Sequence, residues 1–380
     1  MSLTRGRTDS YWQYEAAVDL KLPVAKPRLP SAEEILPYLR RIDQSRWYSN
    51  GGPLVLEFEA RLADHAGGKG AVATVANATV GLTLALLACD LPPGSLCMVP
   101  AWTFAASGHA IEQAGSIPWI VDVDAESWAL EPAAAREFLR EAPAPVSAVM
   151  PVSPFGHPID FEGWNSFREE TGVAVVIDAA AMFDTIRIGS VPAVVSLHAT
   201  KVFGVGEGGC VLGSDPAFIQ EVQKRANFGF WGSREATVQS CNGKMSEYTA
   251  AVGLASFDSW KKTRADFARV ATAYRAAFDG QARVRLQAGF GERWVSSTVI
   301  VAVEEAGAEA VGQALAANGM GTRRWWGGGL HRHGAFAKFP RGKTDQTEEL
   351  ADIVIGLPCW RDLPNEKIGQ ICEIVIAAAG

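Results

Sequence analysis

The chain has 380 residues, a formal net charge of −7 and 38 glycines, and 48% of it is hydrophobic. This length and composition are typical of a two-domain globular α/β enzyme. The acidic balance argues against a nucleic-acid-binding protein, in which a basic patch is expected. The start of the chain shows no signal-peptide pattern, and no apolar run approaches the roughly 18 residues of a membrane span. We therefore expect neither a nucleic-acid partner nor a membrane partner.

The six cysteines show neither a CxxC motif nor a framework of spacings, which predicts reduced core residues of a cytoplasmic protein. The histidines are scattered, and the close pair His331 and His333 has no obvious third ligand, so no metal site is predicted. No nucleophile elbow is present. The glycines of Gly204–Gly209 match a dinucleotide fingerprint only weakly, because they precede a strand instead of opening a helix.

Residues 1–30 are mixed in character and interrupted by prolines, and we interpret them as an N-terminal arm. Ser31 and Glu34 form a capping-box pattern that predicts a helix over 32–42. Apolar residues at helical spacing between Leu54 and His65 predict a second helix.

From residue 71 onward, short apolar runs alternate with helical patterns. Such alternation is typical of an α/β fold with a mainly parallel sheet covered by helices on both faces. In these sheets, ligands bind beyond the carboxyl ends of the strands. The predicted strands are 71–75, 96–100, 118–121, 146–152, 173–178, 193–197 and 209–212, and the predicted helices are 79–89, 103–114 and 131–141.

The last third of the chain predicts a smaller α+β unit. Its expected elements are a long helix over 247–278 with a possible break near Lys261, a strand over 293–303, and helices over 308–317 and 365–378. We place the domain boundary near residue 250. The predicted division is an arm over 1–30, a large domain over 31–250 and a small domain over 251–380.

Lys201 and Asp178 are the most informative residues of the chain. Lys201 follows a predicted strand and precedes a glycine-rich stretch, and Asp178 ends an apolar strand 23 residues upstream. Pyridoxal phosphate (PLP) requires such a pair, a lysine for the Schiff base and an acid for the pyridinium nitrogen. A lone lysine at a strand end is usually a solvated surface residue, and Asp178 by itself is equally consistent with a helix N-cap.

Asn77, Ala78 and Thr79 open a helix directly after a strand, where backbone amides attract a phosphate. Ser196 is placed to reach the same phosphate from the sheet. Trp102 follows another strand and could stack on a flat ring, although a core aromatic is an equally good interpretation.

Arginines and tryptophans flank a run of glycines over 322–331, which suits an anionic, ring-bearing ligand. Arg324, Trp326 and His331 are therefore candidate substrate-binding residues, although a glycine-rich surface loop would show the same pattern. His198 is a further candidate at the edge of the site.

The chain resembles the DegT/DnrJ/StrS family of PLP-dependent sugar aminotransferases from about residue 30 to its end. Each motif is weak alone, but together and in the family's order they are specific. The matching segments are Pro53–Glu59, Val99–Phe104, Pro151–Gly156, Ser196–Lys201, Gly206–Gly209 and Asn242–Glu247.

The resemblance implies the type I PLP-dependent aminotransferase fold and a homodimer with shared active sites. It implies that Lys201 is the Schiff-base lysine, that Asp178 is the partner of the pyridinium nitrogen and that Trp102 stacks on the ring. The amides of Ala78 and Thr79, with Ser196, would hold the phosphate. Asn242 would reach the cofactor phosphate of the neighbouring subunit.

Three segments depart from the family's pattern. The phosphate turn reads Asn77-Ala78-Thr79 instead of Ser-Gly-Thr, and Ala181 stands where the family usually has a glutamine that supports the 3′-oxygen of the cofactor. The segment 326–331 reads Trp-Gly-Gly-Gly-Leu-His and matches the family's Tyr-x-Pro-x-x-His only in its histidine.

The reaction that the resemblance implies is transfer of an amino group from L-glutamate to a nucleotide-linked keto-deoxysugar.

Two alternatives remain at this point. A PLP-dependent sugar dehydratase of the same family is expected to lack the lysine, so Lys201 argues against it. A non-catalytic sensor or regulator that keeps the fold is the other alternative, although no basic tract or added DNA-binding segment is apparent.

Overall fold

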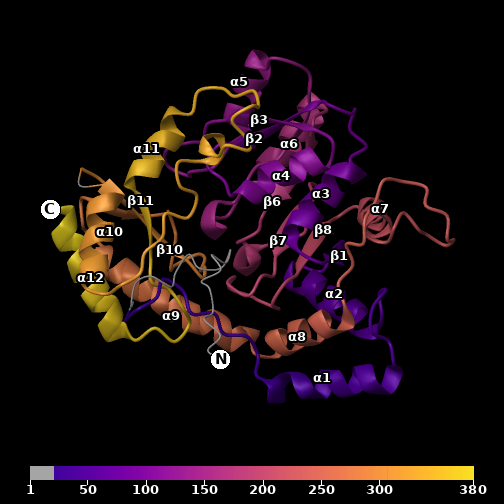
Figure 1. Ribbon diagram of the computed structural model, residues 1–380, viewed down its shortest axis with the longest axis horizontal. Helices are drawn as coiled ribbons and strands as arrows, with labels where there is room; N and C mark the ends of the chain where they lie inside the picture. The colour runs from indigo at the N-terminus through magenta and orange to yellow at the C-terminus, as the bar shows by residue number, and fades with distance from the viewer. Residues whose placement is uncertain (1–20, 306) are drawn as a thin grey trace, which may run out of the picture.

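The computed structural model describes residues 21–305 and 307–380 (Figure 1). Most of the predicted arm, residues 1–20, lies outside the described residues. The part that is described runs along the C-terminal third of the chain, where Leu22 bridges Met320 and Ala25 bridges Cys359.

The central sheet is built from two ladders that share one segment. β5 pairs with β4 and β6 pairs with β7, while Val176 between them donates its N–H to Val149 O at 3.1 Å. The strand order is therefore β3-β2-β4-β5/β6-β7-β8-β1. The strands are β1 (Ala71–Val75), β2 (Leu96–Pro100), β3 (Ile117–Val121), β4 (Val146–Val149), β5 (Ala174–Val175), β6 (Ile177–Asp178), β7 (Ala193–Ser196) and β8 (Gly209–Gly213).

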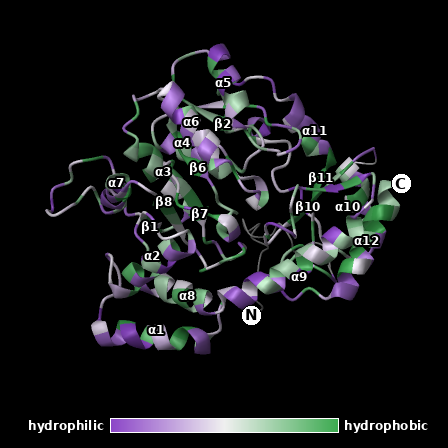
Figure 2. Ribbon diagram, turned by 180° about the vertical axis from the view of Figure 1, so that it is seen from behind, coloured by the Kyte–Doolittle hydropathy of each residue, from purple (hydrophilic) through white to green (hydrophobic). Residues whose placement is uncertain are grey.

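The predicted mainly parallel sheet is confirmed, with β8 running against both of its neighbours. Successive side chains of a strand point to opposite faces, so Val194 and Val195 enter different cores. One face is covered by α3 (Ala78–Ala88), α4 (Ala105–Gln113) and α7 (Pro216–Ala226), and the other by α2 (Pro53–His65), α5 (Pro132–Glu141) and α6 (Phe161–Thr171). Figure 2 shows the hydrophobic colour of these strands against the largely hydrophilic α1 (Ala32–Ser45).

The C-terminal third contains an antiparallel sheet of order β11-β10-β9, and its first helix, α8, packs against α1 and α2. The long helix over 247–278 breaks at Ser259, slightly before the predicted break near Lys261. The elements of this region are α8 (Glu247–Asp258), α9 (Trp260–Phe278), β9 (Val284–Leu286), β10 (Val299–Val303), α10 (Gly307–Ala317), α11 (Asp345–Ile353), β11 (Val354–Leu357) and α12 (Asn365–Ala379).

The predicted strand over 293–303 is too long, because only β10 from Val299 is a strand. Its first residues form a turn in which Gly291 donates its N–H to Trp294 O at 2.9 Å. The domain boundary near residue 250 stays a prediction, since α8 and α9 follow one another with a single residue between them.

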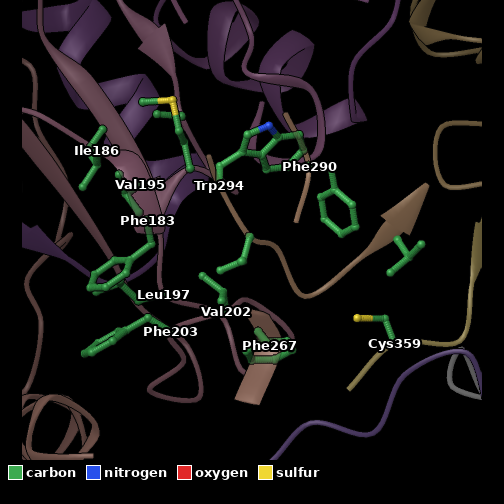
Figure 3. Packing of buried hydrophobic residues seen from close by; sticks show 14 of the residues in the cluster. Phe183, Ile186, Val195, Leu197, Val202, Phe203, Phe267, Phe290, Trp294 and Cys359 are labelled. Atoms are coloured by element: carbon green, nitrogen blue, oxygen red, sulfur yellow. The ribbon is translucent and has the colours of Figure 1, made fainter. Parts of the chain in front are cut away.

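An apolar cluster fixes the segment around Lys201. Figure 3 shows Leu197, Val202, Phe203 and Phe183 packed together, and the rings of Phe183 and Phe203 stack with centroids 4.2 Å apart. All four side chains are at most 4% exposed. The chain on both sides of Lys201 is therefore held in the core, which fixes the place of the lysine between them.

Candidate active site

A cavity of about 650 Å³ opens beyond the carboxyl ends of the central strands. Residues that follow β1, β2, β4, β6 and β7 meet there, together with residues of the C-terminal third. The cavity is lined by Asn77, Ala78, Thr79, Thr103, Phe104, Ser153, Phe155, Asp178, Ala180, Ala181, Ser196, His198, Lys201, Glu207, Ser296, Trp325 and Trp326, among others. The expected convergence of residues distant in sequence at this edge of the sheet is thus observed.

Lys201 reaches the cavity from a tight turn after β7. Its N–H bonds His198 O at 2.9 Å, and the N–H of Ala199 bonds Gly206 O at 2.7 Å. Burial lowers the pKa of the Lys201 amine, whereas the charge of Asp178 raises it. The net lowering favours the neutral amine, which is the form that reacts with an aldehyde.

Asp178 ends β6 and is only 5% exposed. Its Oδ2 accepts a hydrogen bond from Ser107 Oγ at 2.7 Å, and its Oδ1 accepts one from the N–H of Ala180 at 3.1 Å. Burial raises the pKa of the Asp178 carboxyl, while both hydrogen bonds and the charge of Lys201 lower it. Ser107 is a residue that sequence reasoning did not identify.

The start of α3 forms an anion cradle at the cavity. Asn77 caps the helix, because its Oδ1 accepts the N–H of Val80 at 2.9 Å. Gly209 of β8 lets sheet and helix approach closely, since a Cβ added there would lie 2.7 Å from Ala78 N. First-turn amides have no partner within a helix, so those of Ala78 and Thr79 are suited to a phosphate.

The expectation that Trp102 stacks on the ring is corrected by the structure. Trp102 is 3% exposed and does not line the cavity, because its side chain packs against Phe155 and Trp326 with ring centroids 6.4 and 5.3 Å away. Phe104, two residues later at the start of α4, lines the cavity and is 61% exposed. Of these two residues, Phe104 is therefore the one available to a flat ring.

The predicted substrate-binding residues separate into two groups. His198 and Trp326 line the cavity. His331 does not, because it belongs to a short 3-10 turn, Leu330–Arg332, and its buried side chain lies against α11, with Nε2 3.2 Å from Glu348 Oε1. Arg324 is exposed and also lies outside the lining. The assignment of His331 as a residue of this cavity is therefore wrong, whereas the substrate-binding role of Arg324 stays a prediction.

Ala181 lies at the cavity, whereas Asn242 lies outside it. Ala181 lines the cavity and offers no side-chain hydrogen-bonding group there. Asn242 is exposed, lies outside this cavity and accepts a hydrogen bond from Lys244 Nζ at 2.8 Å. Its expected role toward a neighbouring subunit stays a prediction.

Over residues 21–305 and 307–380, no three His, Cys, Asp or Glu side chains are grouped so that they could hold a metal ion. Within the same ranges, no helix combines the length and the apolar character needed to cross a membrane.

The cavity contains what PLP requires: a buried amine, a buried carboxylate, an anion cradle at a helix start and an exposed aromatic face. Together, fold and site define the class of PLP-dependent aminotransferases of type I fold. The chain belongs to the DegT/DnrJ/EryC1/StrS aminotransferase family, whose model matches residues 30–376.

Known proteins support this assignment. The chain is 30% identical to the dTDP-4-amino-4,6-dideoxy-D-glucose transaminase of Shigella dysenteriae, over 61% of this chain and 63% of that protein. A putative PLP-dependent aminotransferase from Bacillus cereus superposes with a TM-score of 0.87 at 28% identity, covering 93% of this chain and 99% of its own. DesI, solved with its TDP-sugar product, gives a TM-score of 0.84 at 28% identity, with 95% and 94% covered.

Proposed function

We propose that the protein transfers an amino group from L-glutamate to a keto-deoxysugar carried by a nucleotide. The Shigella relative is named for a dTDP-linked amino sugar, and DesI was solved with a TDP-sugar product, so two similar proteins handle nucleotide-linked sugars. The observation that carries the proposal is the meeting of Lys201, Asp178 and the α3 anion cradle at one cavity.

Bound PLP would supply an electron sink for the carbon whose proton is moved. Lys201 would hold the cofactor's aldehyde and then carry that proton, for which burial already favours its neutral amine. Asp178 would keep the ring nitrogen protonated. The amides of Ala78 and Thr79, with Ser196, would bind the phosphate, and Phe104 would cover one face of the ring.

We further propose a homodimer in which Asn242 completes the partner's site, because it is exposed and lies outside the cavity of its own chain. Large aromatic side chains stand exposed near the α1–α2 connection, where Trp47 and Tyr48 are each 49% exposed and Tyr48 stacks on Tyr248. Such a patch is suited to contact with another chain. A cytoplasmic location is part of the proposal and is supported by six free cysteines.

The test is turnover with L-glutamate and a panel of nucleotide-linked keto sugars, with and without the amino donor. Lys201→Ala is expected to abolish turnover and the visible absorbance of the holoenzyme, because the amine is lost. Lys262→Ala is the matched control, since its side chain is 74% exposed and pairs with Asp266 of its own helix.

Retained transamination by Lys201→Ala would remove the proposed role of the lysine. Conversion of a keto sugar without glutamate would instead favour a dehydratase.

A further inference from the structure

Ser107 joins a helix to the buried carboxylate of the cavity. It lies in the first turn of α4 and is completely buried, at 0% exposure. Its Oγ donates to Asp178 Oδ2 at 2.7 Å, across 71 residues of sequence. A serine hydroxyl in a buried position must satisfy its hydrogen bonds within the protein. The Ser107 hydroxyl does so by donating its proton to the carboxylate of Asp178.

A second hydroxyl holds the oxygen of Ser107. Thr103 Oγ1 lies 2.8 Å from Ser107 Oγ, and Thr103 is itself only 1% exposed. Because the Ser107 proton points to Asp178, Thr103 is the donor and Ser107 the acceptor of this second bond. With Ala180 N–H on Oδ1, both carboxylate oxygens are held by the protein. The carboxylate plane is thus fixed before any ligand arrives.

The hydrogen bond also acts on the charge of Asp178. Burial raises the pKa of this carboxyl, and the bond from Ser107 is the largest of the effects that lower it. Loss of the hydroxyl would leave one buried oxygen without its donor, which costs more than the loss of an exposed bond.

We propose that Ser107 is a positioning residue for the reaction, which orients Asp178 and keeps it ionised toward the cofactor's ring nitrogen while Thr103 holds the Ser107 hydroxyl. This inference rests on the proposed use of PLP by Asp178 and Lys201. Its observable consequence is cofactor binding, which is measured without any sugar substrate. A purely structural Ser107 would affect stability alone.

The test is a double-mutant cycle with Ser107→Ala, Asp178→Asn and the double variant. Removing one hydrogen bond to a charged group is expected to weaken PLP binding about tenfold and to lower kcat by about the same factor. The KM for glutamate should change less than about twofold, because Ser107 contacts no substrate. In the Asp178→Asn background, Ser107→Ala should have almost no further effect, since it acts through that carboxylate.

Two further variants separate positioning from packing. Ser107→Thr keeps the hydroxyl and should restore PLP affinity to within about threefold of the unmodified protein. Ser116→Ala removes another buried hydroxyl, 6% exposed and at the opposite end of the sheet, and should leave PLP affinity unchanged.

The proposal is overturned if Ser107→Ala binds PLP normally, or if its effect is the same with and without Asp178. If Asp178→Asn itself leaves PLP affinity and kcat unchanged, the proposed role of Asp178 fails as well. Failure of the sugar substrates alone would leave the PLP measurements, and hence this inference, standing.

Discussion

Lys201 and Asp178 illustrate how burial acts on two opposite charges at once. Desolvation favours the neutral form of each, lowering the pKa of the lysine and raising that of the acid. Their mutual attraction and the donors on Asp178 act against this tendency. The pair is therefore sensitive to every hydrogen bond around it, which makes its neighbours important to its chemistry.

His331 provides a prediction about pH. Burial lowers the pKa of its ring, although Glu348 opposes this and Arg332 adds to it. The folded protein therefore binds a proton less readily than the unfolded chain. The contribution of His331 to the free energy of unfolding is complete above about pH 6.5, the pKa of a histidine in the unfolded chain. As the pH falls below this value, the contribution is lost at up to about 1.4 kcal/mol per pH unit. Urea unfolding between pH 7.5 and 5.5 measures this loss.

His331→Gln should reduce that pH dependence, because one titrating group is gone, while His157, whose pKa burial also lowers, keeps its own share. His109→Gln is the control, since the His109 side chain is 48% exposed. An equal pH dependence in the His331 variant and the unmodified protein would contradict the prediction.

Single residues differ in how well sequence anticipates them. The alternation of strands and helices predicts that Asn77, Asp178 and Lys201 meet, because strand ends share one edge of a sheet. It cannot decide between Trp102 and Phe104, since the chain leaves strand geometry after Pro100 and the side-chain alternation ends with it. Ser107 is invisible for another reason: its only signal is a contact across 71 residues.

The N-terminus of helix α2 is capped by a side chain from another helix. Its N-cap is Gly52, which has no side chain to accept a hydrogen bond. Glu247, at the start of α8, supplies the missing acceptors: its carboxylate receives the N–H of Leu54 at 2.8 Å and that of Val55 at 3.0 Å. The group is 1% exposed, so this cap is a buried charge-assisted contact between two helices.

Glu247→Gln is expected to destabilise the protein by about 1–3 kcal/mol, because one of the two buried N–H groups loses its acceptor. Urea unfolding of the variant measures the change in free energy. Glu34→Gln, in the exposed capping box of α1, is the matched control and should cost well below that. An equal loss of unfolding free energy in the two variants would show that the buried cap contributes no more to stability than the exposed one.

Some elements with clear local signals agree with the sequence, but two helices that carry their own caps, Asp160 on α6 and Asp215 on α7, were not predicted. β1 and β2 begin and end as predicted, and the capping box of Ser31 and Glu34 forms at α1. β11 was not predicted, because α11 runs into it without a turn residue between Ile353 and Val354. β9, α6, α7 and α11 were also missed. β9 is three residues long and depends on pairing with β10, which no local pattern encodes.

The proposed dimer makes the active site a property of two chains. Lys201 would belong to one subunit and Asn242 to the other at every site. Mutations at these two positions should therefore compensate when they lie in different subunits, which a site within one chain cannot do.

Lys201→Ala and Asn242→Ala, each impaired alone, should regain activity when mixed and allowed to exchange subunits. In a mixed dimer one site carries both changes and the other carries neither, so about a quarter of full activity is expected after random exchange. Steady-state assays before and after exchange measure this gain. The matched control is Lys201→Ala mixed with Lys201→Ala/Asn242→Ala, which has no intact pair. No gain above that control would place the site within a single chain.

The shared segment of the central sheet has one more consequence. Residues 174–178 link β4 to β7, and the ladder continues through Ala179, whose N–H donates to Val194 O at 2.9 Å. A cofactor held at once by the α3 cradle, Lys201 and Asp178 would bind to several strand ends together. It would therefore connect the ladder that contains β1, β8, β7 and β6 at more than one point. Binding of the cofactor would then stabilise the sheet around residues 174–178. The same few atoms would serve both catalysis and the stability of the fold.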